Sequence, residues 1–137
     1  MITTVEKALF LKGIDLFSAI PGEDLAQIAL IAEEEERDAG EVVIREGEMG
    51  DALYLVVEGK VRVRKGEREV AELGEREVFG EMALLDPAPR SATVEAASDV
   101  TLLRIRREDF ADVMAERPDI ARGVIQVLTR RLRAATR

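Results

Sequence analysis

Residues 79–94 read FGEMALLDPAPRSATV, a glycine and a short apolar run followed by a loop with two prolines and an arginine. Residues 82–85 are too few for more than one helical turn, and the start of such a turn leaves backbone N–H groups free for an anion. Arg90 adds a planar, permanently charged group that suits a phosphate. Glu81 would repel phosphate, so we expect it to accept a hydrogen bond from a sugar hydroxyl. Together these residues predict a site for a ribose phosphate.

Short apolar runs separated by glycines surround this stretch between Arg37 and Ile105. Runs about 10 residues apart with turn signals between them predict a sandwich or barrel of strands. Residues 61–64 (VRVR) alternate strictly, so one face of that strand should be buried and the other exposed. Tyr54 is interpreted as a core residue. The glycines interpreted as turn residues without a ligand role are Gly47, Gly50 and Gly59.

Helical patterns flank the β region. Residues 5–12 predict a short helix, and a second helix follows Pro21 with acidic residues in its first turn. Glu33–Glu36 is interpreted as the solvated end of that second helix. Pro118 suits the first position of the last helix. The other end of this helix is rich in arginine and has no glycine cap, so we expect the helix to be frayed or truncated there. The expected organisation is one domain, 1–137, with helices in 1–36, a β-roll in 37–106 and C-terminal helices in 107–137.

Composition excludes several functions. The chain has no cysteine and no histidine, so it lacks thiol chemistry and the commonest general base and metal ligand. We therefore predict no catalytic residue and no metal site, which argues against a metal-dependent barrel enzyme. The net charge of −8 argues against nucleic-acid binding by this chain alone. No long apolar run and no signal peptide are visible, so we expect a cytoplasmic protein without membrane insertion.

The segment 79–94 resembles the phosphate-binding cassette of the cyclic-nucleotide-binding domain family. That pattern is roughly F-G-E-hydrophobic-small-hydrophobic, a variable loop, then P-R-small-A-T-V, and every fixed position is matched. Residues 39–63 resemble the early turns and the strand–turn–strand signature of the same family. Arg76 departs from the pattern, because relatives usually have a glycine there. The resemblance implies a mainly β fold, a double-stranded β-helix (a jelly-roll-like β-roll) with N-terminal helices and C-terminal lid helices.

The resemblance also implies roles for individual residues. Glu81 would accept the ribose 2′-hydroxyl, Arg90 would neutralise the cyclic phosphate, and Gly80 would let the backbone approach the sugar. Three backbone amides would face the phosphate, and two small residues would add hydrogen bonds and clearance beside it. The expected ligand-binding set is Gly80, Glu81, Met82, Ala83, Leu84, Arg90, Ser91 and Ala92. The candidate residues of a lid over the base are Leu128, Arg131 and Leu132.

We therefore expect a sensor that is not an enzyme, needs no cofactor and binds cyclic AMP or cyclic GMP. In this family a threonine after the arginine favours the guanine base. The residue here is Ser91, which is compatible with either base. Of the two nucleotides we favour cyclic AMP. The signal would be a movement of the C-terminal helix. The alternative is a nucleotide-free β-roll that uses this helix to bind a partner. Candidate partners of the helix are an effector domain or a second copy of the chain.

Overall fold

The computed structural model describes residues 1–136, which form two compact units. The helical unit combines Met1–Ala32 with the segment that starts at Glu108, and the β unit is Glu33–Arg107. The sequence patterns predicted one domain, with helices in 1–36, a β-roll in 37–106 and C-terminal helices in 107–137. The predicted C-terminal helices also included Arg137, which lies outside the described residues.

The helical unit consists of α-helices and one short 3₁₀ turn. Thr3 caps the first helix through a capping box with Glu6, and Pro118 opens the last helix as predicted. The elements are α1 (Thr4–Lys12), η1 (Asp15–Phe17), α2 (Gly22–Ile31), α3 (Arg107–Glu116) and α4 (Pro118–Ala135).

An aromatic stack and an ion pair hold the helical unit together. The rings of Phe17 and Phe110 stack with centroids 5.7 Å apart. Asp24 is only 4% exposed and accepts a 2.7 Å hydrogen bond from Nη1 of Arg117, at the junction of α3 and α4. Because loss of one partner would leave a buried charge unpaired, this ion pair fixes the start of α4.

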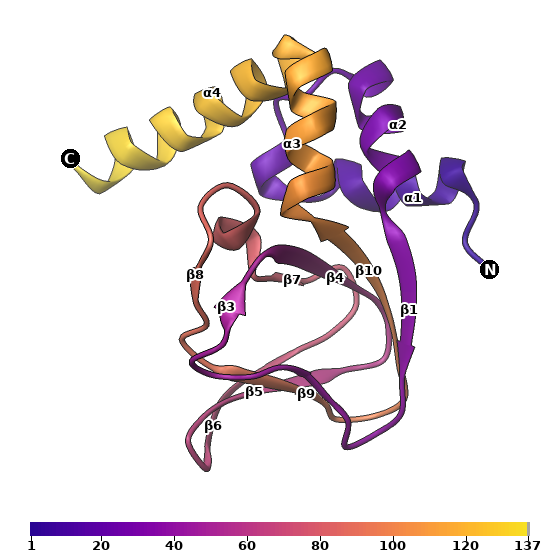
Figure 1. The fold of residues 1–137 in the computed structure, drawn as a ribbon, viewed down its shortest axis with the longest axis vertical. Helices are drawn as coiled ribbons and strands as arrows, with labels where there is room; N and C mark the ends of the chain where they lie inside the picture. The colour runs from indigo at the N-terminus through magenta and orange to yellow at the C-terminus, as the bar shows by residue number, and fades with distance from the viewer. Residues whose placement is uncertain (137) are drawn as a thin grey trace. The chain divides into compact units, whose positions relative to one another are not determined.

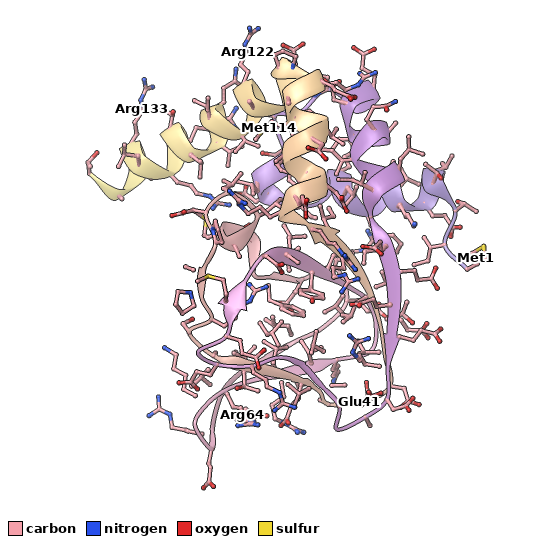
Figure 2. The ribbon with its side chains drawn as sticks, in the orientation of Figure 1. Met1, Glu41, Arg64, Met114, Arg122 and Arg133 are labelled. Carbon is pink, nitrogen blue, oxygen red and sulfur yellow. The ribbon has the colours of Figure 1, made fainter. Side chains whose placement is uncertain are left out.

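Helix α4 has one apolar face and one charged face. Figure 2 shows Arg122 and Arg133 pointing away from the helix, and both are exposed. A Cβ atom on Gly123 would lie 2.7 Å from the carbonyl oxygen of Ala19, so the glycine permits a close approach of the two segments. The buried residues of α4 are Ile120, Gly123, Val124 and Val127. Within residues 1–136, no helix is both long and apolar enough to cross a membrane.

The β unit contains two antiparallel four-stranded sheets and a two-stranded ribbon. One sheet has the order β1-β10-β4-β7, the other β2-β9-β5-β6, and β3 pairs with β8 (Figure 1). This arrangement agrees with the predicted mainly β roll. The strands are β1 (Glu33–Arg37), β2 (Val42–Ile44), β3 (Met49–Gly50), β4 (Ala52–Glu58), β5 (Val61–Lys65), β6 (Arg68–Leu73), β7 (Val78–Phe79), β8 (Ala88–Pro89), β9 (Thr93–Ala96) and β10 (Val100–Arg106). The connection between β7 and β8 contains a second 3₁₀ turn, η2 (Glu81–Leu84).

The core of the β unit anchors the beginning of the segment 79–94. Tyr54 on β4 stacks on Phe79 on β7, with ring centroids 5.0 Å apart and planes 6° from parallel. This confirms the interpretation of Tyr54 as a core residue and fixes the residue that precedes Gly80. The buried members of this core are Ala52, Tyr54, Val56, Val61, Phe79, Val94, Ala96, Val100 and Leu102.

The prediction for Glu33–Glu36 was wrong, because these residues begin strand β1 and pair with β10. Alternate carboxylates of the strand meet arginines of β10. Oε1 of Glu33 lies 2.9 Å from Nε of Arg106, and Oε1 of Glu35 lies 3.0 Å from Nη1 of Arg104. Opposite charges across the strands stabilise this pairing, whereas adjacent carboxylates at a helix C-terminus would be destabilising.

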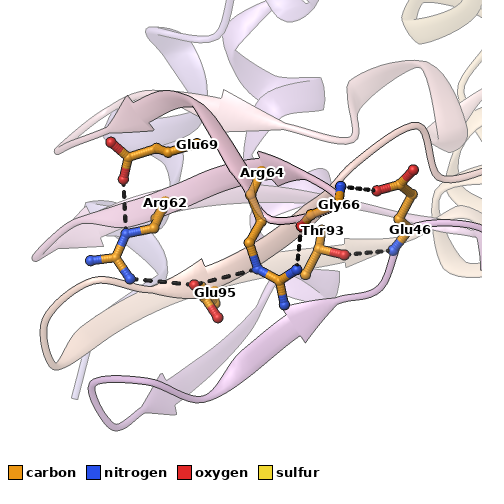
Figure 3. A network of polar contacts seen from close by, with 7 residues as sticks. All are labelled: Glu46, Arg62, Arg64, Gly66, Glu69, Thr93 and Glu95. Atoms are coloured by element: carbon orange, nitrogen blue, oxygen red, sulfur yellow. Dashed lines mark hydrogen bonds and ion pairs between the residues drawn. The ribbon is translucent and has the colours of Figure 1, made fainter.

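The outer face of β5 carries the charged residues of the VRVR alternation, as predicted. In Figure 3, Arg62 donates from Nε to Glu69, at 2.8 Å, and from Nη1 to Glu95, at 3.3 Å. Arg64 reaches the same carboxylate of Glu95, with Nε 3.5 Å away. The two arginines therefore lie on the face opposite to Val61, which is buried.

The turn between β6 and β7 forms although Arg76 occupies the position where a glycine is usual. Arg76 has a left-handed φ of 71°, and its N–H donates to the carbonyl of Val56 at 2.7 Å. The amide of Glu77 donates to the carbonyl of Gly74 at 3.1 Å. A side chain in this backbone region costs about 1–2 kcal/mol, so the turn keeps its shape at a local cost.

Candidate functional site

Gly80 introduces the turn η2 and makes room for Arg90. Its φ of 75° is left-handed, which glycine adopts without strain. A Cβ atom at this position would lie 2.5 Å from Nη1 of Arg90 and 2.8 Å from the carbonyl oxygen of Ala52. The observed role of Gly80 is therefore clearance for the guanidinium, while its predicted approach to a sugar stays a prediction.

The backbone of Arg90 is held on both sides by the loop that precedes β3. Its N–H donates to the carbonyl of Glu48, and its carbonyl accepts from the N–H of Gly47, each at 2.8 Å. The ribbon of β3 and β8 adjoins this clamp, with Met49 opposite Pro89. The side chain of Arg90 therefore projects from a fixed backbone, although Arg90 follows a loop with two prolines.

The guanidinium of Arg90 is half-buried and has no carboxylate within ion-pair distance among residues 1–136. Nη2 donates to the carbonyl of Ala52 at 2.9 Å. Burial lowers the pKa of the Arg90 guanidinium, while the nearby Tyr54 and Asp51 oppose that shift. A partly desolvated cation that lacks a counter-charge favours an anionic ligand.

Gly50 lies against the side chain of Arg90 in a strand, which corrects its interpretation as a turn glycine. It lies in the extended strand β3, and a Cβ atom there would be 2.4 Å from Nε of Arg90. Gly50 and Gly80 thus flank the same side chain. The sequence gives no direct signal for this contact, because only the pairing of β3 with β8 brings Gly50 to the arginine.

A pocket of about 310 Å³ lies over η2 and the loop that follows it. Six of the predicted ligand-binding residues line it together. Leu84 is buried and Ala92 is half-buried, and neither belongs to the lining. Three lining residues were missed because residues 86–89 were expected to form only a variable loop. The lining residues are Gly80, Glu81, Met82, Ala83, Asp86, Ala88, Pro89, Arg90 and Ser91.

The amides of η2 differ from the expected arrangement at one position. The N–H of Ala83 donates to the carbonyl of Gly80 at 3.2 Å, so it is already engaged within the turn. The amides of Leu85 and Asp86 both donate to the carbonyl of Met82. Ala83 is therefore not a spare donor in this structure, and a ligand would have to share or break its bond.

The candidate lid residues all belong to α4 in the helical unit. Arg131 donates from Nη2 to Oδ2 of Asp15, at 2.8 Å. Leu128 is half-buried, and Leu132 is 65% exposed. Their predicted contact with a nucleobase stays a prediction.

The sequence profile of the cyclic nucleotide-binding domain matches residues 34–117. The cyclic AMP receptor protein of Thermus thermophilus is 37% identical over 130 residues, which are 91% of this chain and 60% of that protein. A cyclic nucleotide-gated potassium channel of Rhizobium etli is 38% identical over 112 residues, 82% of this chain and 31% of the channel. This chain thus spans less than two thirds of either relative.

Solved structures agree with the sequence comparison. The N-terminal domain of a transcriptional regulator from Streptomyces coelicolor superposes with a TM-score of 0.87 at 33% identity, covering 92% of this chain and 94% of that one. The catabolite activator protein of Thermus thermophilus gives a TM-score of 0.71 at 36% identity, over 90% of this chain and 60% of that one. The antiparallel roll, the pocket over η2 and these matches lead to one conclusion: the chain belongs to the cyclic nucleotide-binding domain family.

Proposed function

We propose that this chain binds cyclic AMP in preference to cyclic GMP, in the pocket over η2, and that binding is signalled through α4. The observation that carries the proposal is Arg90, a half-buried cation without an ion-pair partner in residues 1–136, clamped at its backbone beside two glycines. In the bound state Arg90 contacts the cyclic phosphate and Glu81 accepts the ribose 2′-hydroxyl. Ser91 lies at the exposed rim of the pocket, and in the bound state it would lie beside the phosphate.

Cyclic AMP is favoured because relatives named for this ligand recur among the matches. Besides the Thermus receptor, the cAMP-dependent protein kinase regulatory subunit of Mycosarcoma maydis is 41% identical over 101 residues, 71% of this chain and 19% of that protein. Titration calorimetry of the intact chain with both cyclic nucleotides tests the proposal directly. We expect cyclic AMP to bind at least tenfold more tightly. Equal affinities would contradict the base preference, and no heat with either nucleotide would contradict the function.

Glu81→Gln is expected to weaken cyclic AMP binding by about 1–3 kcal/mol, because a charge-assisted hydrogen bond to the ribose becomes a neutral one. The variant should lose little more when 2′-deoxy cyclic AMP replaces cyclic AMP, since the two changes remove the same contact. Calorimetry of the original protein and of Glu81→Gln, each with cyclic AMP and with 2′-deoxy cyclic AMP, gives the four affinities that this comparison needs. Glu67→Gln, an exposed site outside the pocket, is the matched control. An unchanged deoxy penalty in the variant would show that Glu81 does not contact that hydroxyl.

Signalling through α4 predicts that residues 128–136 exchange their amide hydrogens more slowly once cyclic AMP is bound. Residues 132–136 at the end of α4 are all exposed, so they bury little surface that would hold the end of the helix closed. In the free chain this end should therefore open readily. Hydrogen exchange with and without saturating cyclic AMP measures the change. Equal rates in the two states would remove α4 as the signalling element.

A second candidate function is the binding of a partner helix, which is favoured by the exposed face of α4. Ile125 is 61% exposed and Leu132 is 65% exposed, and with Leu128 they follow a spacing of three and four residues. This spacing is typical of helix pairing. The partner would be an effector domain or a second copy of the chain. A nucleotide-free interaction module of this kind would give no heat in the titrations above.

A further inference from the structure

The pocket over η2 contains more negative than positive side chains. Its charged lining residues are Glu81, Asp86 and Arg90, two carboxylates and one guanidinium. Asp86 lies two residues beyond the end of η2, and its amide donates to the carbonyl of Met82 at 3.0 Å. Its side chain is exposed at the pocket and has no part in the contacts proposed above. A carboxylate at the mouth of an anion site requires a separate explanation.

Arg90, the one cation among the described lining residues, is restrained. The backbone of Arg90 is clamped by Gly47 and Glu48, its Nη2 is bonded to Ala52, and glycines lie against its side chain. It is therefore placed to meet one anionic group and cannot move freely toward a second charge. A cyclic phosphodiester carries one negative charge, whereas a phosphate monoester carries close to two at neutral pH, because its second pKa is about 6.

We propose that Asp86 makes the pocket selective for monoanionic phosphodiesters and against dianionic phosphate monoesters such as 5′-AMP. This inference rests on the proposed binding of a cyclic nucleotide in the same pocket. The repulsion energy between Asp86 and the ligand is proportional to the ligand charge. If this repulsion raises the dissociation constant of a monoanion by some factor, it raises that of a dianion by the square of the same factor. As a general scale, two unit charges about 7 Å apart in water interact by about 0.6 kcal/mol, which corresponds to about a threefold change in affinity.

Asp86→Asn tests the inference, because it removes the charge, keeps the size and leaves the backbone bond to Met82 in place. Three ligands separate charge from ring shape: cyclic AMP, 5′-AMP, and the methyl ester of 5′-AMP, which is acyclic but monoanionic. Dissociation constants are measured by competition with a fluorescent cyclic AMP analogue at about 0.01 M ionic strength, where the Debye length is about 30 Å. We expect the variant to bind both monoanions about threefold more tightly and 5′-AMP about tenfold more tightly.

Asp38→Asn is the matched control, since Asp38 is an exposed aspartate of the β unit outside this pocket. It should leave the ratio of the 5′-AMP and cyclic AMP dissociation constants unchanged. Equal gains for all three ligands in Asp86→Asn, or no gain for 5′-AMP, would overturn the role of Asp86 while cyclic AMP binding stands. Failure of the unsubstituted chain to bind cyclic AMP would instead overturn the proposed function, and this inference with it.

Discussion

Arg90→Ala is expected to weaken cyclic AMP binding by about 100-fold, the largest loss that any single substitution in the pocket should cause. Truncating one partner of a partly buried, charge-assisted contact costs about 2–5 kcal/mol, and 100-fold corresponds to about 2.7 kcal/mol. Arg90 is the only cation among the pocket-lining residues that the structure describes, so no neighbour there replaces it. Calorimetry with cyclic AMP measures the loss.

Loss of binding should not reflect loss of the fold. Arg90→Ala removes a half-buried charge and a single hydrogen bond to Ala52, so the free energy of unfolding should change by about 1 kcal/mol or less. Arg90→Lys keeps the charge but loses the planar fork, and should fall between the two proteins. Arg68→Ala, an exposed arginine on β6, is the matched control. A dissociation constant within about threefold of the original would contradict Arg90 as the phosphate ligand.

The sequence predicted those parts of the fold that depend on local pattern. Alternation in residues 61–64 was enough to place Val61 in the core and Arg62 outside, because adjacent side chains of a strand point to opposite faces. Pro118 marked the start of α4 because its fixed φ and missing N–H suit the first helical position. Both signals lie within the elements that they predict.

The errors concern residues whose environment is made by distant parts of the chain. Glu33 and Glu35 belong to a strand because arginines about 70 positions later lie beside them, and no local pattern contains that information. Gly50 resembles any glycine near a turn until β3 pairs with β8 and brings it against Arg90. The same limit explains why Asp86, in the variable loop of the motif, was absent from the expected ligand-binding set. Motif matching finds the residues that the members of a family share. The lining of a pocket also includes residues that differ between members, and a motif does not identify these.

Gly59→Ala is expected to destabilise the β unit by about 3 kcal/mol or more, through two penalties that the structure separates. Gly59 has a left-handed φ of 90°, and a Cβ atom would lie 2.3 Å from the carbonyl oxygen of Asp99. Gly40 has a φ of 91° but open space around it, so Gly40→Ala carries the backbone strain alone, about 1–2 kcal/mol. Gly74 has neither feature, and Gly74→Ala should change stability by less than about 1 kcal/mol.

Urea unfolding followed by tyrosine fluorescence measures this series, because Tyr54 is the sole tyrosine, there is no tryptophan, and Tyr54 lies in the core of the β unit. Gly59 lies outside the pocket, so the folded fraction of Gly59→Ala should keep its affinity for cyclic AMP. The difference between the stability losses of Gly59→Ala and Gly40→Ala measures the steric clash with Asp99. Asp99 lies 40 residues after Gly59 in the sequence. Equal losses at the two glycines would show that the backbone at Asp99 moves aside at no cost, and that strain in the turn is the whole effect.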